Sequence, residues 1–208
     1  IRGVFAYVAD GLLQPGEEAP AHQPQLLPGQ VKLKNINGDD KLDEEDMVLI
    51  GRNDPKFIFG FNNNFSYKNF DLNIYMYGQV GKIAGANSYY DAWGSYGNRI
   101  KLGQNVPVSF KDAWSSDNQT STRPSFIESA YGTGDLFLQK ISFLRIRNIT
   151  LGYTVPVSKS ICNRLRVYAD VNNPCVWTNW KGQDPETDSN TNAYPNVTSF
   201  SIGVDISF

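Results

Sequence analysis

The last ten residues, 199–208, read S-F-S-I-G-V-D-I-S-F and decide how the rest of the chain is interpreted. Successive side chains of a β-strand point to opposite faces, so a period of two predicts a strand with one wholly apolar face. The apolar residues are Phe200, Ile202, Val204, Ile206 and Phe208. A soluble antiparallel sheet alternates in the same way, so the interpretation depends on whether other strands repeat the pattern at membrane-spanning length.

The same alternation of apolar and polar side chains recurs in four earlier stretches. They are residues 57–67, 70–79, 143–155 and 165–172. The first two form a predicted hairpin whose strands have the length that a tilted strand needs to cross a bilayer. In the third stretch, Arg145 and Arg147 are expected to interrupt the apolar face where the strand leaves the membrane.

Short and long connections alternate along the chain. The short ones are 68–69 and 156–163, and the long ones are 11–56, 81–142 and 178–196. Outer-membrane barrels have short periplasmic turns and long extracellular loops. We therefore predict an all-β fold, an antiparallel up-and-down meander that is a partial, C-terminal segment of a large transmembrane β-barrel with long extracellular loops. Residues 1–56 are predicted to be an extracellular loop region, and residues 57–208 the C-terminal barrel strands.

Composition argues against several other classes of protein. The net charge is −2 and no basic run occurs, so no nucleic-acid partner is expected. Apolar runs are too short for a transmembrane helix. Cys162 and Cys175 are too far apart along an extended chain to pair, and they lack metal-site spacing. The chain opens within an alternating stretch and without methionine, so we expect a fragment of a longer protein.

Residues 35–46, N-I-N-G-D-D-K-L-D-E-E-D, follow the pattern of a calcium-binding loop, with oxygen ligands at alternate positions. The predicted ligands are Asn35, Asn37, Asp39, Lys41 through its backbone carbonyl, Asp43 and Asp46. Asp40 stands where such loops usually have glycine, and the alternative is a solvated acidic loop that leads into a short helix. The predicted role of calcium is structural, because no nucleophile, base or cleft accompanies the loop.

The segment 81–134 is rich in aromatic residues without a clear period. Its candidate ligand-binding residues are Tyr89, Tyr90, Trp93 and Trp114. Such rings could stack on a sugar or could pack the segment onto itself, and packing is the favoured interpretation.

Several stretches in the same order together resemble one known family. They are the 35–46 loop followed by V-L-I-G at 48–51, the strand 57–67 with F-D-L at 70–72, L-R-I-R-N-I-T-L-G-Y-T at 144–154, the stretch from V-Y at 167–168 to W-T at 177–178, G-Q-D-P-E at 182–186, and the terminal Phe208. This set resembles the C-terminal β-barrel portion of SusC/RagA-type TonB-dependent outer-membrane transporters of Bacteroidota. The motifs cover about two-thirds of the chain.

The resemblance implies a plugged barrel in the bacterial outer membrane that imports glycan or peptide fragments. Its implied partners are a SusD-like surface lipoprotein that covers the barrel, the TonB complex acting through an N-terminal part outside this chain, an oligosaccharide or peptide substrate, and membrane lipid. The plug and most of the barrel are expected to lie outside this chain. The chain is not expected to be an enzyme.

Two alternatives come from other functional classes. The first is a soluble carbohydrate-binding β-sandwich, in which the apolar faces of two sheets would meet across a core. The second is a hydrolase that uses paired carboxylates such as Asp184 and Glu186, which would require both acids to converge on one bond. The position of the apolar faces decides between the first alternative and the barrel.

Overall fold

The computed structural model describes residues 3–85, 102, 103, 105, 108–126, 129–158, 162–182, 184–187 and 194–208. The chain divides into two compact units. The first comprises residues 1–53, 83–139 and 188–191, and the second comprises residues 54–82, 140–187 and 192–208. The predicted division at residues 56 and 57 stays a prediction. In the described part of the chain, no helix has the length and apolar character to cross a membrane.

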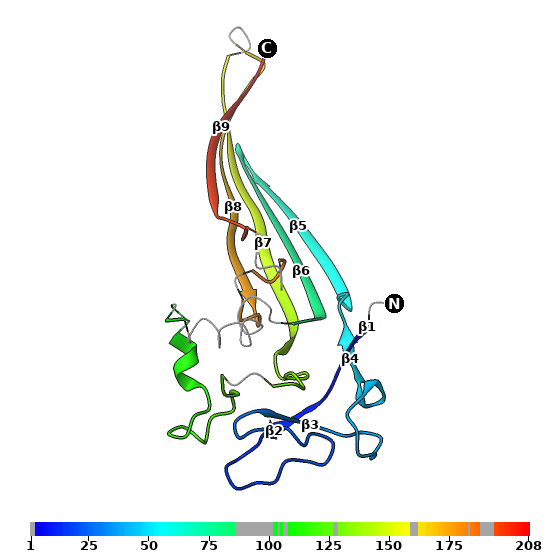
Figure 1. Cartoon of the computed structure of the whole chain (residues 1–208). Helices are drawn as coiled ribbons and strands as arrows, with labels where there is room; N and C mark the ends of the chain where they lie inside the picture. Colours follow the sequence, from blue (N-terminus) through cyan, green and yellow to red (C-terminus); the bar gives the residue numbers. More distant parts are fainter. Residues whose placement is uncertain are drawn as a thin grey trace. The chain divides into compact units, whose positions relative to one another are not determined.

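The second unit is built on one five-stranded sheet (Figure 1). Its strands, in both chain and spatial order, are β5 (Phe57–Tyr67), β6 (Phe70–Gly85), β7 (Leu138–Val155), β8 (Arg164–Thr178) and β9 (Ser199–Ser207). Each strand pairs with the next in the chain, and the pairs β5–β6, β7–β8 and β8–β9 are antiparallel. The predicted up-and-down meander is confirmed.

The strand pairing keeps apolar residues together on one side of the sheet, which we call the apolar side. Pairs on it include Phe61–Met76, Leu151–Ala169 and Val167–Val204. The opposite, polar side brings Asp170 next to Thr150 and Ser201. A slip of one residue would exchange the two sides, so the repeated alternation explains why this register forms.

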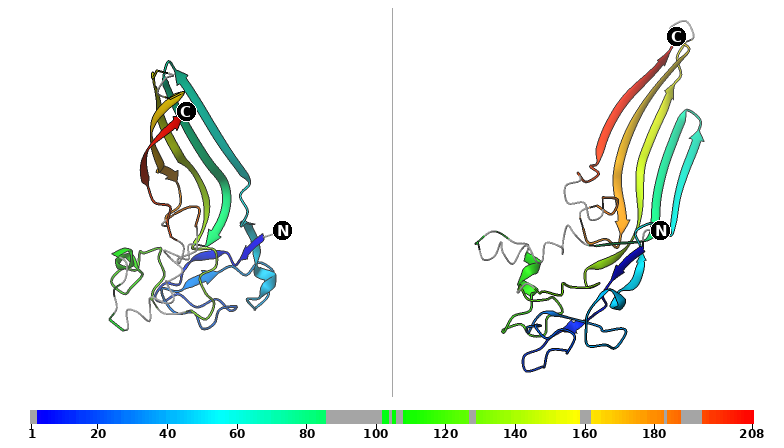
Figure 2. Two further views of the ribbon diagram at one scale, coloured as in Figure 1. Left: turned by 90° about the horizontal axis from the view of Figure 1, so that it is seen from above. Right: turned by 45° about the vertical axis from the view of Figure 1, so that its right-hand side comes forward.

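The apolar side is exposed. Ile202 is 83% exposed, Phe200 79%, Phe61 55% and Leu151 50%. Figure 2 shows the strands as a single curved layer, and no second layer of described residues covers these side chains. A β-sandwich would bury them between two sheets, so the alternative of a soluble sandwich is not favoured.

The two outer strands each have one unpaired edge. Within the described residues, β5 pairs only with β6, and β9 pairs only with β8. Unpaired strand edges expose backbone donors and acceptors, which a closed barrel satisfies by further pairing.

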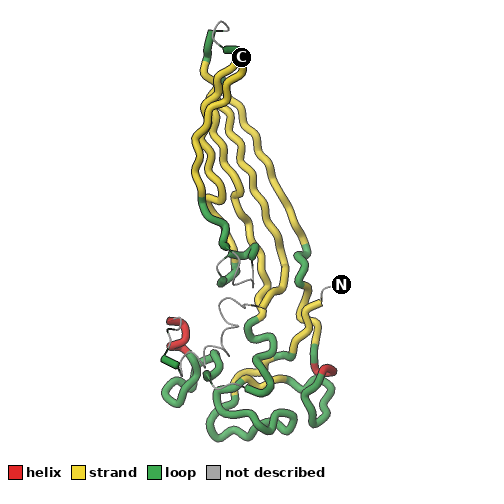
Figure 3. The backbone as a smooth tube through the Cα atoms, turned by 45° about the horizontal axis from the view of Figure 1, so that its top comes forward, coloured by secondary structure: helices red, strands yellow, loops and turns green. Residues whose placement is uncertain are grey.

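The first unit contains short elements joined by loops, as the tube in Figure 3 shows. β1 (Gly3–Ala6) pairs with β4 (Val48–Arg52), and β2 (Ala9–Leu12) pairs with β3 (Val31–Leu33). The described residues also form the 3₁₀ turns η1 (Glu44–Asp46) and η2 (Val108–Asp112). One apolar cluster of described residues consists of Leu12, Val31, Leu33 and Trp114.

Candidate functional site

An ion-pair network crosses the polar side of the sheet. Arg166 on β8 donates through Nε and Nη2 to Asp71 on β6, at 2.9 and 2.5 Å. Its Nη1 donates to Asp205 on β9 at 3.2 Å. Between Arg166 and Asp71 runs β7, where Gly152 leaves the necessary space. A Cβ atom at Gly152 would lie 2.5 Å from both Arg166 Nε and Asp71 Oδ1, so the glycine lets one guanidinium join three strands.

Amide and hydroxyl groups continue this polar side toward the long connections. Asp170 accepts hydrogen bonds from Thr150 at 2.8 Å, from Asn172 at 2.7 Å and from Asn148. Asn73 donates to Asn62 and Asn64 on β5, at 2.7 and 2.6 Å. These groups favour contact with water, unlike the apolar side chains on the reverse of the same strands.

A β-bulge shifts the alternation near the end of the paired region. Between Ile146 and Asn148, β7 has one residue where β8 has two, Asn173 and Pro174. Asn173 adopts a φ of 49°, and Pro174 has no N–H to donate. Bulges of this kind bend a strand and re-aim its side chains.

Contacts next to this bulge correct the expectation that Arg145 and Arg147 interrupt the apolar side. The guanidinium of Arg147 lies 5.8 Å from the ring centre of Tyr77, and the ring of Phe143 packs on Tyr77 at 5.8 Å. Tyr77 is on the polar side, because it lies on the same face of β6 as Asp71. Arg147 therefore faces the polar side, as does Arg145 two residues before it.

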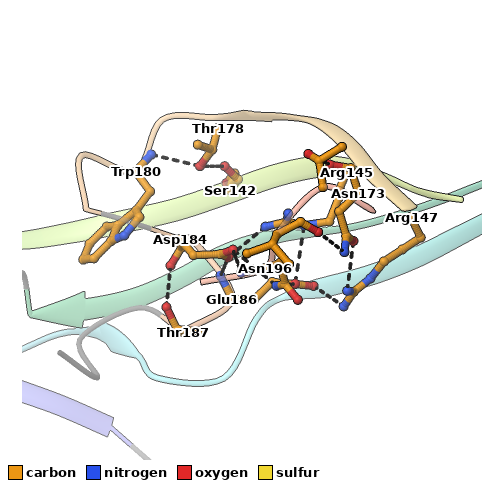
Figure 4. Close-up of polar contacts among 12 residues, drawn as sticks. Ser142, Arg145, Arg147, Asn173, Thr178, Trp180, Asp184, Glu186, Thr187 and Asn196 are labelled. Carbon is orange, nitrogen blue, oxygen red and sulfur yellow. Dashed lines mark hydrogen bonds and ion pairs between the residues drawn. The ribbon is translucent and has the colours of Figure 1, made fainter. Parts of the chain in front are cut away.

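Both arginines bind carboxylates from the connection between β8 and β9 (Figure 4). Arg145, which is 3% exposed, donates through Nη2 to Asp184 at 2.8 Å, and its Nε lies 3.4 Å from Glu186 Oε2. Arg147 donates to Glu186 Oε1 at 2.7 Å. Asn196 donates its side-chain amide to Glu186 Oε2 at 2.6 Å and to Asp184 at 3.2 Å. We call the two arginines together with segments 179–182, 184–187 and 194–198 the clasp.

Further contacts tie both ends of the clasp to the sheet. Asn179 accepts a hydrogen bond from Ser142 N at 2.8 Å and donates to the carbonyl of Lys140 at 2.7 Å. Trp180 is 6% exposed, and its indole packs on Gly182, where a Cβ atom would lie 2.5 Å from the ring carbon Cε2. At the other end, Thr198 donates to the carbonyl of Asn173 at 2.9 Å. The connection is thus anchored at both ends.

Asp184 in the clasp has the opposite character from a general acid. Burial raises the pKa of Asp184, but hydrogen bonds from the backbone N–H groups of Glu186 and Asn196, together with Arg145, outweigh that effect and hold the pKa below its usual range. Asp184 is 3% exposed and Glu186 is shared by two arginines. Hydrolysis by this pair is not supported, because a catalytic acid requires a raised pKa and access to a bond.

The predicted calcium loop is curved by hydrogen bonds from its own backbone. Asn35 Oδ1 accepts from Gly38 N at 2.6 Å, Asn37 Oδ1 from Asp39 N at 3.0 Å, and Asp39 Oδ1 from Lys41 N at 2.9 Å. These side chains all supply hard oxygen atoms, the ligand type that calcium prefers. Within the described residues, however, no group of three His, Cys, Asp or Glu side chains is arranged to hold a metal ion.

Asp46 closes this loop from the inside. It is fully buried and accepts hydrogen bonds from Ile36 N at 2.7 Å, Asn37 N at 3.4 Å and Asp43 N at 3.1 Å. The bond from Ile36 N is the main reason why the pKa of Asp46 is lowered. Asp43 Oδ1 in turn accepts from Glu45 N at 2.9 Å and begins the 3₁₀ turn η1. A calcium ion at Asp46 would have to replace part of this bonding.

Of the four candidate aromatic residues, three lie outside the described part of the chain: Tyr89, Tyr90 and Trp93. Trp114 is 9% exposed and belongs to the apolar cluster of the first unit. Its ring packs on Gly29, where a Cβ atom would lie 2.6 Å from ring carbon Cδ2. Cys162 and Cys175 are both free, as predicted.

These features define a class: a segment of an antiparallel barrel wall with one side suited to lipid and the other to water. No protein-family model matches the chain. It is 29% identical over 201 residues to the TonB-dependent receptor P3 of Formosa agariphila, covering 87% of this chain and 19% of that protein. It is 27% identical over 180 residues to the TonB-dependent receptor SusC of Bacteroides thetaiotaomicron, covering 83% of this chain and 17% of SusC.

The fold is similar to that of the RagAB peptide transporter. The TM-score is 0.76 at 22% identity, and the match covers 99% of this chain and 23% of that chain. The resemblance to SusC/RagA-type TonB-dependent proteins is thus confirmed, together with the all-β barrel-segment fold and the outer-membrane location. The chain spans about a fifth of the length of the curated relatives it matches.

Proposed function

We propose that the chain is a wall segment of a TonB-dependent importer that carries glycan or peptide fragments across the outer membrane. The observation that carries this proposal is the sheet with an exposed apolar side, a hydrogen-bonded polar side and two unpaired edges. In a closed barrel, lipid covers the apolar side, water or substrate contacts the polar side, and neighbouring strands pair with the two free edges. No catalytic role is assigned to it.

The proposed partners follow from the relatives. Their names describe TonB-dependent receptors and a peptide transporter. We assign to the full-length protein a SusD-like surface lipoprotein as a lid, and energy supplied by the TonB complex through an N-terminal region. The substrate class is an oligosaccharide or a peptide, since hydroxyl and amide groups of either can bond to the amides on the polar side.

Growth of a deletion strain tests this function. The gene for the full-length protein is deleted and the strain is grown on single oligosaccharides and peptides, with growth on the corresponding monosaccharides and amino acids as control. Loss of growth on one polymer, restored by the wild-type gene, supports import. Full-length protein that stays in the supernatant after membranes are pelleted without detergent would overturn the proposal.

We also propose that residues 35–46 bind calcium in a structural role. The support is an all-oxygen donor set on a loop that is already curved by Asn35, Asn37 and Asp39. Calcium should raise the melting temperature of the full-length protein, and Asp39→Ala should remove that increase. Lys34→Ala, just outside the loop, is the control. An unchanged calcium-dependent shift in Asp39→Ala would exclude this site.

A further inference from the structure

We infer that the clasp is an inward-folded constriction, which narrows the import path on the polar side of the sheet at the level of the β-bulge. This inference rests on the proposed function, because the polar side is the lumen side only in a barrel. It adds a specific role for segments 184–187 and 194–198 of the connection between β8 and β9: they are fastened to the wall on the polar side.

The first argument is the side on which the clasp docks. Its anchors, Arg145 and Arg147, face the same side as Tyr77 and Asp71, opposite to the apolar residues that lipid would cover. Asp184, Glu186 and Asn196 reach these anchors, so the segments that carry them lie over the polar side. Figure 4 shows these side chains converging in one cluster.

The second argument is burial along that side. Gln79, Phe143 and Arg145 are at most 8% exposed, whereas Tyr75, on the same face of β6 as Gln79, is 40% exposed. The polar side is therefore covered around Arg145, where the clasp docks, and more open at Tyr75.

The third argument is the strength of the fastening. Ion pairs of 2.7 to 3.4 Å join the two arginines to the two carboxylates. The side chains of Arg145, Asp184 and Glu186 are at most 15% exposed. Buried charges require partners, and removal of one leaves the other uncompensated. The clasp is thus held in place at neutral pH and sets the free width beside it.

Cysteine accessibility in the full-length transporter tests the inference. Tyr194, 89% exposed, is replaced by cysteine in a background without other cysteines. Intact cells are treated with a small maleimide or with a polymer-linked maleimide too bulky for a pore. We expect the bulky reagent to label Tyr194→Cys about tenfold more slowly than the small one, because it reacts only when the clasp opens. Glu18→Cys, exposed in the predicted extracellular region and outside the 35–46 loop, should react equally with both.

Opening the clasp should abolish the difference in labelling rate between the small and the bulky reagent. Adding Asp184→Asn to Tyr194→Cys should bring the bulky reagent close to the rate of the small one, whereas Arg166→Gln, which breaks the other ion-pair network on this side, should not. Equal labelling of Tyr194→Cys by both reagents without the Asp184 substitution would overturn the inference. In that case the proposed function would still stand, provided that the protein is found in the outer membrane and restores growth of the deletion strain; only the constriction would be rejected.

Discussion

Replacing Ile202 with arginine should destabilise the full-length barrel, whereas the same substitution at the adjacent Ser201 should be tolerated. Ile202 is 83% exposed on the apolar side. Moving such a side chain from water into lipid contributes about 1.5 to 3 kcal/mol. Arginine loses that contribution and also meets hydrocarbon, so we expect a cost of roughly 2 to 4 kcal/mol at mid-bilayer depth. At Ser201, on the water-filled side, the expected cost is below about 1 kcal/mol.

The measurement is reversible unfolding of the full-length protein in lipid vesicles, with the free energy taken from denaturant titration. Ile202→Phe distinguishes whether the side chain of residue 202 contacts lipid or a packed protein core. Fluid lipid accommodates the larger ring, whereas overpacking a core costs about 1 to 3 kcal/mol. An arginine at Ser201 that costs as much as one at Ile202, or a marked loss in Ile202→Phe, would refute the assignment of the two sides.

Three further substitutions test the polar contacts. Gly152→Ala should cost about 1 to 3 kcal/mol in the same unfolding assay, because its Cβ would displace the ion pair across β7; Gly60→Ala, with its nearest neighbour 3.6 Å away, is the control. Asp184→Asn should cost roughly 1 to 3 kcal/mol at neutral pH, and since the pKa of Asp184 is lowered, its difference from wild type should persist above about pH 5 and shrink as pH falls below about 4. Asp46→Ala should speed hydrogen exchange of the three amides that it accepts from, and unchanged exchange would contradict its role in closing the loop.

The strands of the main sheet could be predicted because their environment repeats every second residue. From Phe57 to Tyr67 and from Ser199 to Ser207, one set of side chains suits lipid and the other suits water, so a single register satisfies both. No comparable signal extends through the first unit, whose short strands pair across loops, as β2 does with β3. Their positions depend on tertiary packing, including Trp114 against Gly29.

The clasp could not be predicted, because it depends on one irregularity in pairing. Strict alternation places Arg147 on the same side as Ile149, but its guanidinium lies beside the Tyr77 ring on the polar side, next to the register shift between Ile146 and Asn148. Asn173 and Pro174 are the available signal: proline within a strand is confined to edges and bulges. The carboxylates of Asp184 and Glu186 lie 39 residues from the arginines in sequence, beyond the reach of local patterns.

The orientation of Arg145 and Arg147 and the clasp together solve one electrostatic problem. On the apolar side, the two arginines would extend the row that contains Ile149 and Leu151, and each would have to leave hydrocarbon or be neutralised there. On the polar side, Asp184 and Glu186 neutralise them, and the same ion pairs hold segments 184–187 and 194–198 over that side. Because one set of contacts has both effects, loss of the arginine–carboxylate pairs would leave buried charge without a partner and would release the clasp.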